Sequence, residues 1–208
     1  MLCEIVDFPK IPTDILNLII EEFEQKRNML VPIEGFEYFK MLPSAQNSID
    51  SKNPIEQNLK NNIGISPSQA REIFGDKICY FGLMNAPKLL NQWVFENIKI
   101  KNVHCGIQEF ELGKCFVPHV DLTRTTAYNY IISAGGCDVK TTFYKPKPQY
   151  DNFNITSRTL IPYERIDEIE SVICEEHKWY KLDVSQIHSV ENLDPTKKRL
   201  SITISVIE

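Results

Sequence analysis

Apolar residues recur at helical spacing in the first half of the chain. In the segment 13–26 they fall three and four residues apart: Leu16, Ile19, Ile20 and Phe23. This spacing predicts an amphipathic helix with one face on a core. A second stripe lies later in the chain: Leu89, Leu90, Trp93 and Val94. It predicts a helix over about residues 87–97.

A third helix is indicated between these two stripes by its end signals. Ser66 and Gln69 have the spacing of a capping box, and Pro67 suits the first helical turn. Gly75 follows as a typical stop. The preceding residues 31–65 are rich in Asn, Ser and Pro, so we expect long loops there.

After residue 99 the pattern becomes that of strands. Short β-branched and aromatic runs are separated by turn residues, at 103–110, 126–133, 141–144, 158–163, 169–174, 179–184 and 199–207. This spacing is typical of an antiparallel sandwich or barrel. Because a helical layer can cover one sheet without a second core, residues 1–208 are predicted to form a single α+β domain, mainly β. Residues 1–100 would give helical support and 101–208 the β core.

The last run alternates strictly between polar and apolar side chains. Its polar positions are Arg199, Ser201, Thr203 and Ser205, and its apolar positions are Leu200, Ile202, Ile204 and Val206. We therefore expect one face of this strand on a core and the other on a pocket or in water.

Composition and charge narrow the class of protein. The chain has 208 residues, 42% of them hydrophobic and 25% charged, and a net charge of −5. The acidic balance disfavours a general binder of nucleic acid or anionic membranes. The sequence lacks both an apolar run of about 18 residues and a signal-peptide layout at its start. We therefore expect a cytoplasmic protein without a membrane span.

The six cysteines form no Cys-x-x-Cys pair: Cys3, Cys79, Cys105, Cys115, Cys137 and Cys174. With no export signal they are expected to be reduced thiols, mostly in the core. Histidine is scarce, with His104, His119, His177 and His188. We expect His104 and His177 to be structural.

His119 and Asp121 are the first candidates for chemistry. Residues i and i+2 of an extended chain point to the same side, so an imidazole and a carboxylate can face one point. With His188 they would form the two-histidine, one-carboxylate triad that holds non-haem Fe(II) and leaves positions open. A hairpin between His188 and Arg199 would place a carboxylate-binding cation nearby, whereas Lys198 has the opposite parity.

The order of these residues resembles the 2-oxoglutarate- and Fe(II)-dependent oxygenases, which are built on a double-stranded β-helix, or jelly roll. Their signature is His-x-Asp, a distal His, and then Arg or Lys. Here it consists of His119, Asp121, His188 and Arg199, with Ser201 completing an Arg-x-Ser element. The similarity covers about residues 103–207 and implies a jelly roll with amino-terminal supporting helices.

The resemblance also implies roles for these residues. The catalytic iron ligands would be His119, Asp121 and His188, and the co-substrate 2-oxoglutarate and dioxygen would take the open positions. Arg199, assisted by Ser201, would bind the distal carboxylate of 2-oxoglutarate. Three more residues are candidate co-substrate contacts without a motif match: Arg124, Asn129 and Tyr130.

The implied activity is hydroxylation, or oxidative demethylation, of a substrate while 2-oxoglutarate is decarboxylated to succinate and CO2. The expected substrate is an unidentified small molecule or protein side chain. The same core is compatible with many substrates, because substrate contacts sit on variable loops. Segments 31–65 and 145–157 are candidate lids. The oligomeric state stays open.

Other interpretations remain beside this one. A metal-free or degenerate jelly roll that binds a partner or a sugar is the main alternative, with His188 and Arg199 then on a solvated strand face. Cupins usually carry His-x-His, which the sequence lacks. The iron halogenases of the family lack the carboxylate, but Asp121 is present. Prolyl-4-hydroxylase-like members often have Lys where this chain has Arg199, which disfavours a prolyl substrate.

Overall fold

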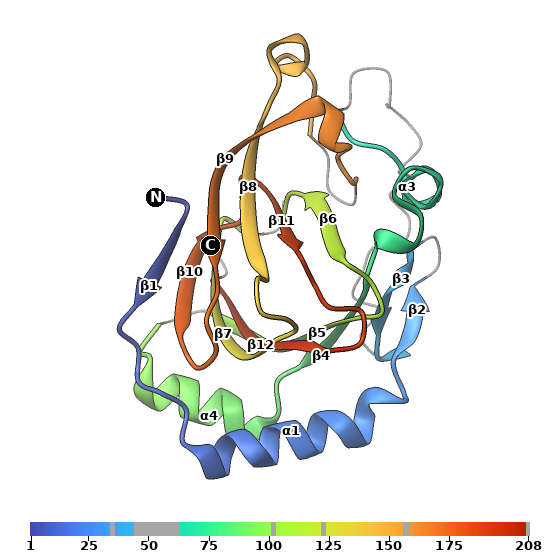
Figure 1. Cartoon of the computed structure of the whole chain (residues 1–208). Coiled ribbons are helices and arrows are strands. Elements are labelled where there is room, and N and C mark those ends of the chain that lie inside the picture. The colour runs from blue at the N-terminus through green and yellow to red at the C-terminus, as the bar shows by residue number, and fades with distance from the viewer. Residues whose placement is uncertain (34–35, 44–62, 101–102, 122–123, 156–158, 207–208) are drawn as a thin grey trace.

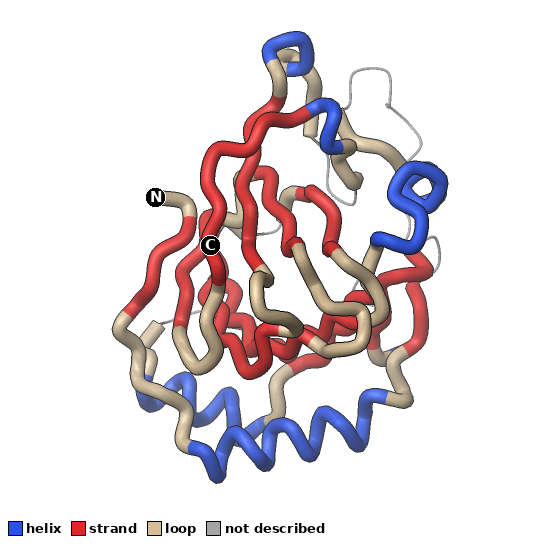
Figure 2. Tube along the Cα trace, in the orientation of Figure 1, coloured by secondary structure: helices blue, strands red, loops and turns tan. Residues whose placement is uncertain are grey.

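Two β-sheets face each other in the structure, with helices on the outside (Figures 1 and 2). It is a computed structural model that describes residues 1–33, 36–43, 63–100, 103–121, 124–155 and 159–206. Among these residues, no helix is long and apolar enough to cross a membrane.

The larger sheet has eight described strands. In spatial order they are β1 (Cys3–Val6), β10 (Trp179–Asp183), β7 (Thr126–Ala134), β12 (Arg199–Val206), β5 (Val103–Glu111), β4 (Tyr80–Asn85), β3 (Phe36–Met41) and β2 (Val31–Ile33). Neighbouring strands are antiparallel except β3 and β4, which are parallel.

The smaller sheet is antiparallel, with strands β6 (Cys115–His119), β11 (Ile187–Glu191), β8 (Lys140–Pro146) and β9 (Ile166–Ile173) in spatial order. From β5 to β12 the chain passes repeatedly between the two sheets (Figure 1). This arrangement is a jelly roll, so the predicted fold class is confirmed.

The two long helices cover the outer face of the larger sheet (Figure 1). Helices α1 (Thr13–Arg27) and α4 (Lys88–Asn97) bury most of their predicted apolar stripes: Leu16, Ile19 and Phe23 from α1, and Leu90, Trp93 and Val94 from α4. These side chains share one core with Ile202 and Ile204 of β12. The apolar face of the last strand therefore packs under the helices, as its alternation predicts.

Helix α3 (Pro67–Phe74) has the predicted end signals. Ser66 Oγ accepts a hydrogen bond from Gln69 N, while Ser66 N donates to Gln69 Oε1 at 3.0 Å. Gly75 ends the helix with φ of 55°, a value that favours glycine. Short 3₁₀ turns complete the described helical elements: η2 (Gly75–Lys77), η3 (Pro148–Tyr150) and η4 (Tyr163–Arg165).

Two expectations for the fold were wrong in part. Residues 1–100 are more than helical support, because β1 to β4 extend the larger sheet, and β2 and β3 lie in the segment expected to be loops. Strand β4 is buried on both faces, so it lacks the alternation that marks a half-buried strand. Residues 44–62 of the predicted loop lie outside the described part.

The predicted strand at 158–163 is also absent from its described residues. Leu160 makes a single antiparallel bridge with Ile65, and Pro162 immediately precedes η4. Proline cannot donate to a β-ladder, which explains why the apolar run does not extend into a strand.

Candidate metal centre

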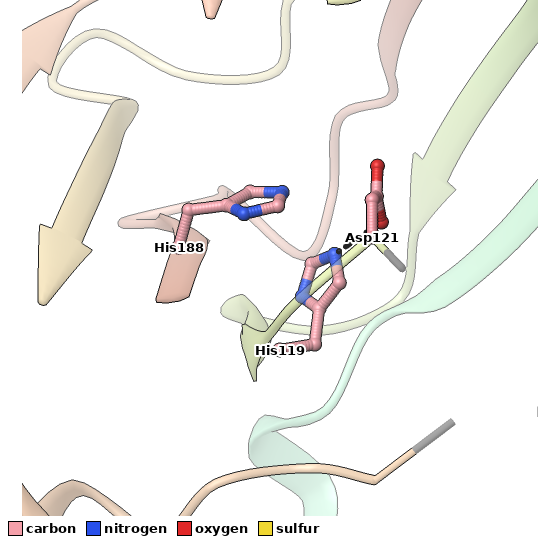
Figure 3. Close-up of side chains that lie close together, drawn as sticks. All are labelled: His119, Asp121 and His188. Atoms are coloured by element: carbon pink, nitrogen blue, oxygen red, sulfur yellow. Dashed lines mark ion pairs between the residues drawn. The ribbon is translucent and has the colours of Figure 1, made fainter. Parts of the chain in front are cut away.

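His119 and His188 lie side by side because their strands pair. His119 ends β6, and its partner across the antiparallel ladder is His188 of β11. Asp121 follows β6, and its backbone N–H donates to Val184 O at 3.0 Å. One ligand atom from each of these three side chains lies within 4.8 Å of the others. Figure 3 shows the side chains converging on one point.

Both imidazoles have one nitrogen committed to the backbone. His119 Nδ1 lies 2.9 Å from Val117 O, and His188 Nδ1 lies 2.9 Å from Gln186 O. A carbonyl only accepts hydrogen bonds, so in the neutral form of each ring the proton sits on Nδ1 and the Nε2 lone pair is free. This arrangement is typical of histidines that bind a metal.

The charge state of the group also suits a cation. Burial, followed by the neighbouring His188, lowers the pKa of His119 to about 4, so its imidazole is neutral near pH 7. Burial alone would raise the pKa of Asp121, but Arg124 and the two histidines outweigh it and lower this pKa to about 2. The neutral His119 imidazole and the Asp121 carboxylate therefore face the point where the three side chains converge, with 3.6 Å between His119 Nε2 and Asp121 Oδ1.

Arg124 binds the second oxygen of this carboxylate. Its Nε and Nη2 lie 2.8 and 2.7 Å from Asp121 Oδ2. Its Nη1 donates to Thr203 Oγ1 and Ser205 Oγ of β12. These contacts place Arg124 beside the candidate metal ligands. They also occupy guanidinium donors that a contact with the co-substrate would need. The alternation of β12 put Thr203 and Ser205 on the pocket side, but it gave no sign of this contact.

Arg199 belongs to the larger sheet, and its side chain lies between the two sheets. Only 3% of its surface is exposed, and its Nη1 has no hydrogen-bond partner in the described part of the chain. The expected hairpin between His188 and Arg199 is wrong, because β11 and β12 belong to different sheets. The connection crosses the sandwich instead of turning back within one sheet.

The other predicted contacts divide between the two faces of the larger sheet. Asn129 is the ladder partner of Thr203, and its buried Oδ1 has no hydrogen-bond partner among the described residues. Ser201 is buried on the same face and donates to Gln108 Oε1 at 3.4 Å. Tyr130, one residue further on, packs instead in the core under the helices. Its assignment as a co-substrate contact was wrong, because neighbouring residues of a strand face opposite sides.

The remaining histidines lie apart from this group. His104 is exposed at the start of β5, and His177 is exposed in a turn with φ of 61°. Of the six cysteines, five are buried and Cys137 is exposed. Cys3 and Cys174 share a core cluster beside Arg199, a neighbourhood that sequence spacing did not indicate.

Comparisons with known proteins agree on the fold. No protein-family model and no curated protein matches the sequence. The chain is similar to the solved structure of a Pseudomonas putida prolyl-4-hydroxylase, with a TM-score of 0.50 and 10% identity over 100% of this chain and 93% of that one.

Two further solved structures match the chain with lower TM-scores. It matches an oxalate oxidase in complex with the substrate analogue glycolate, with a TM-score of 0.36 and 10% identity over 64% of this chain and 52% of that one. It matches a Bacillus subtilis oxalate decarboxylase, with a TM-score of 0.35 and 11% identity over 67% of this chain and 28% of that one. At 10% identity, the similarity to the prolyl-4-hydroxylase structure shows the fold alone. Fold and site together define a jelly-roll protein with a candidate two-histidine, one-carboxylate metal centre.

Proposed function

We propose that this chain is a 2-oxoglutarate- and Fe(II)-dependent dioxygenase. It would hydroxylate, or oxidatively demethylate, a substrate while 2-oxoglutarate is converted to succinate and CO2. One observation carries the proposal: a buried, incompletely bonded Arg199 shares the inner face of β12 with Thr203, which is tied through Arg124 to the candidate metal ligands.

The donor set fits Fe(II). Two imidazoles and a carboxylate that leave positions open are typical of the iron oxygenases. His119, Asp121 and His188 would hold the ion, each imidazole through Nε2 because Nδ1 bonds a backbone carbonyl. When bound, Fe(II) supplies the oxidative chemistry with 2-oxoglutarate and dioxygen. The chain's part is to hold the ligands in place and keep water from them.

Arg199 fits a carboxylate. A buried guanidinium without an anion is costly, and no carboxylate among the described residues forms an ion pair with Arg199. An incoming carboxylate would supply the missing acceptor for Nη1 with charge-assisted hydrogen bonds. Arg199 lies about 13 Å from Thr203 along the same face of β12. Thr203 is the residue that Arg124 links to the candidate metal ligands. A long arginine side chain and a short dicarboxylate can together span that separation, which supports 2-oxoglutarate as the co-substrate.

Two residues on the same face of the larger sheet as Arg199 offer further polar contacts. The Asn129 amide can rotate so that Nδ2 donates to a bound carboxylate. This rotation breaks no hydrogen bond of Oδ1 among the described residues. Ser201 lies on the same face and has a rotatable hydroxyl. Both residues would orient the co-substrate.

Apolar side chains around the histidines would exclude water. The Phe116 ring lies 4.5 Å from the His119 ring, and the Phe143 ring lies 6.1 Å from the His188 ring. A dry site strengthens the contacts between charged groups.

For the substrate, we propose only a chemical class. A small molecule or a protein side chain fits a site whose specificity lies in its loops. A prolyl substrate is not proposed, because the family members that act on proline often have Lys at the position of Arg199. The net charge of −5 disfavours a nucleic-acid strand.

Release of succinate tests the proposal. The protein is incubated with Fe(II), 2-oxoglutarate and ascorbate without added substrate, and succinate is measured over time. We expect slow turnover that requires the metal and is lost in Asp121→Ala. The exposed Asp138 gives a matched control, Asp138→Ala, which should keep it. No succinate from the wild type, or unchanged turnover in Asp121→Ala, would reject the proposal.

A further inference from the structure

We infer that Arg124 is a positioning residue that holds Asp121 so that a single carboxylate oxygen is presented to the metal. The inference rests on the proposed metal centre and assigns to Arg124 a role different from contact with the co-substrate. Arg124 would not bind the metal itself. Its role would be to orient Asp121, which would bind the metal.

The two oxygens of Asp121 are in different environments. Oδ2 accepts a hydrogen bond from the guanidinium Nε at 2.8 Å and forms an ion pair with Nη2 at 2.7 Å. Oδ1 faces His119 Nε2 at 3.6 Å. The planar fork of Arg124 thus occupies Oδ2 and directs Oδ1 to the point where the ligands converge.

Arg124 is itself fixed from the larger sheet. The third nitrogen of its guanidinium, Nη1, donates to Thr203 Oγ1 at 3.1 Å and to Ser205 Oγ at 2.6 Å. Thr203 and Ser205 are alternate residues of β12, so their hydroxyls share a face of a strand that is paired on both sides. The guanidinium therefore has little freedom to turn while both contacts remain.

By holding Oδ2, Arg124 would limit Asp121 to one metal-binding oxygen. A carboxylate can bind a metal through one oxygen or through two, and a second bound oxygen occupies a position that a reactant needs. With Oδ2 held by Arg124, Asp121 offers one oxygen and leaves that position available. Removal of the fork frees the carboxylate to rotate, which weakens the preorganised site and permits binding through both oxygens.

Metal binding by the full-length protein tests this role without relying on turnover. Mn(II) affinity is measured by titration, and the visible absorption spectrum of the Co(II) form reports coordination. We expect Arg124→Met to bind Mn(II) about 10–100-fold more weakly than the wild type, the usual effect of removing a partner of a metal ligand, and to change the Co(II) spectrum. Arg124→Lys, which keeps the charge but loses the fork, should recover only part of the affinity.

Two further variants separate positioning from folding. Arg165 is another partly buried arginine, and it donates to Ile63 O away from the centre. Arg165→Met should bind Mn(II) like the wild type. The double variant Thr203→Val, Ser205→Ala keeps Arg124 but removes its anchor, and it should weaken Mn(II) binding several-fold. It also serves if Arg124→Met does not fold.

The outcomes distinguish this inference from the proposed function. If the wild type binds Mn(II) and Arg124→Met and the double variant bind it equally well with unchanged Co(II) spectra, Arg124 has no positioning role and the metal centre stands. If the wild type binds no Mn(II), the metal centre is wrong and the inference falls with it.

Discussion

His188 is the ladder partner of His119, and their ring centroids lie 4.4 Å apart. Each ring bonds through Nδ1 to the backbone carbonyl two residues before it, Val117 O for one and Gln186 O for the other. Two adjacent strands thus orient their imidazoles in the same local way. The pairing of β6 with β11 brings together two candidate metal ligands that are far apart in the sequence.

This relationship makes His188 testable against a matched histidine. We expect His188→Ala to weaken Mn(II) binding by more than about 100-fold, since losing a ligand should exceed the loss of a partner of a ligand. His104→Ala, at an exposed position on β5, should leave the affinity unchanged. Calorimetric titration measures both. Equal affinities of the two variants would remove His188 from the metal centre.

Arg199 and Lys198 form a natural pair for testing the carboxylate site. Arg199 is buried between the sheets, while Lys198 forms ion pairs with Glu24 and Glu109. In the Mn(II)-loaded protein, Arg199→Met should weaken binding of N-oxalylglycine, an analogue of 2-oxoglutarate, by about 30-fold or more, the cost of removing one partner of a buried charge pair. Lys198→Met should have little effect. Similar affinity in both variants would contradict the role of Arg199.

Asn129 and Tyr130 test the assignment of the two faces of β7. Asn129→Ala should weaken binding of N-oxalylglycine with little change in stability, because its Oδ1 makes no hydrogen bond in the described structure. Tyr130→Ala should leave the affinity per folded molecule unchanged but lower the free energy of unfolding by about 3–5 kcal/mol, as expected for a large aromatic in a core. Urea unfolding and ligand titration separate the two effects. The reverse pattern would mean that the faces are exchanged.

Glu191 should make stability depend on pH. Burial opposes its ionisation, but hydrogen bonds from Tyr144 and Tyr163, together with Lys140, outweigh burial and hold the pKa of Glu191 below its usual value of 4.5. Because the folded-state pKa is the lower one, this stabilisation is present above pH 4.5 and is lost as the pH falls through the folded-state pKa.

Replacing this carboxylate measures the effect. Glu191→Gln should lower the free energy of unfolding by about 1–3 kcal/mol at pH 7, and the difference from wild type should shrink as the pH falls below 4.5. The more exposed Glu168 is the control, since Glu168→Gln should change stability by less than about 1 kcal/mol. A difference for Glu191→Gln that is constant from pH 7 to pH 3 would show that the charge of Glu191 is not responsible.

Much of the β core is predictable because its signals are local. The alternation of β12 separates Ile202 and Ile204 from Arg199 and Ser201, and the two groups do lie on opposite faces. The capping box at Ser66 likewise depends only on neighbouring residues. Such patterns describe one element at a time.

The parts that were missed depend on relations between elements. The connection after His188 crosses from one sheet to the other, and nothing in its composition distinguishes that crossing from a hairpin. Whether Asn129 or Tyr130 points between the sheets depends on where β7 begins. A run of polar and aromatic residues does not determine that starting point. The contact of Arg124 with Thr203 joins segments far apart in the chain, so only the folded structure indicates it.

A melting scan tests the central claim most directly, with Mn(II) and N-oxalylglycine in place of Fe(II) and 2-oxoglutarate. A ligand that binds only the folded state adds about 2.7 kcal/mol at 100 times its dissociation constant. For a chain of this size we therefore expect the melting temperature of the wild type to rise by about 5–10 °C with both compounds. His119→Ala should show no such rise. No rise in the wild type, or an equal rise in His119→Ala, would contradict a metal-dependent site for the co-substrate.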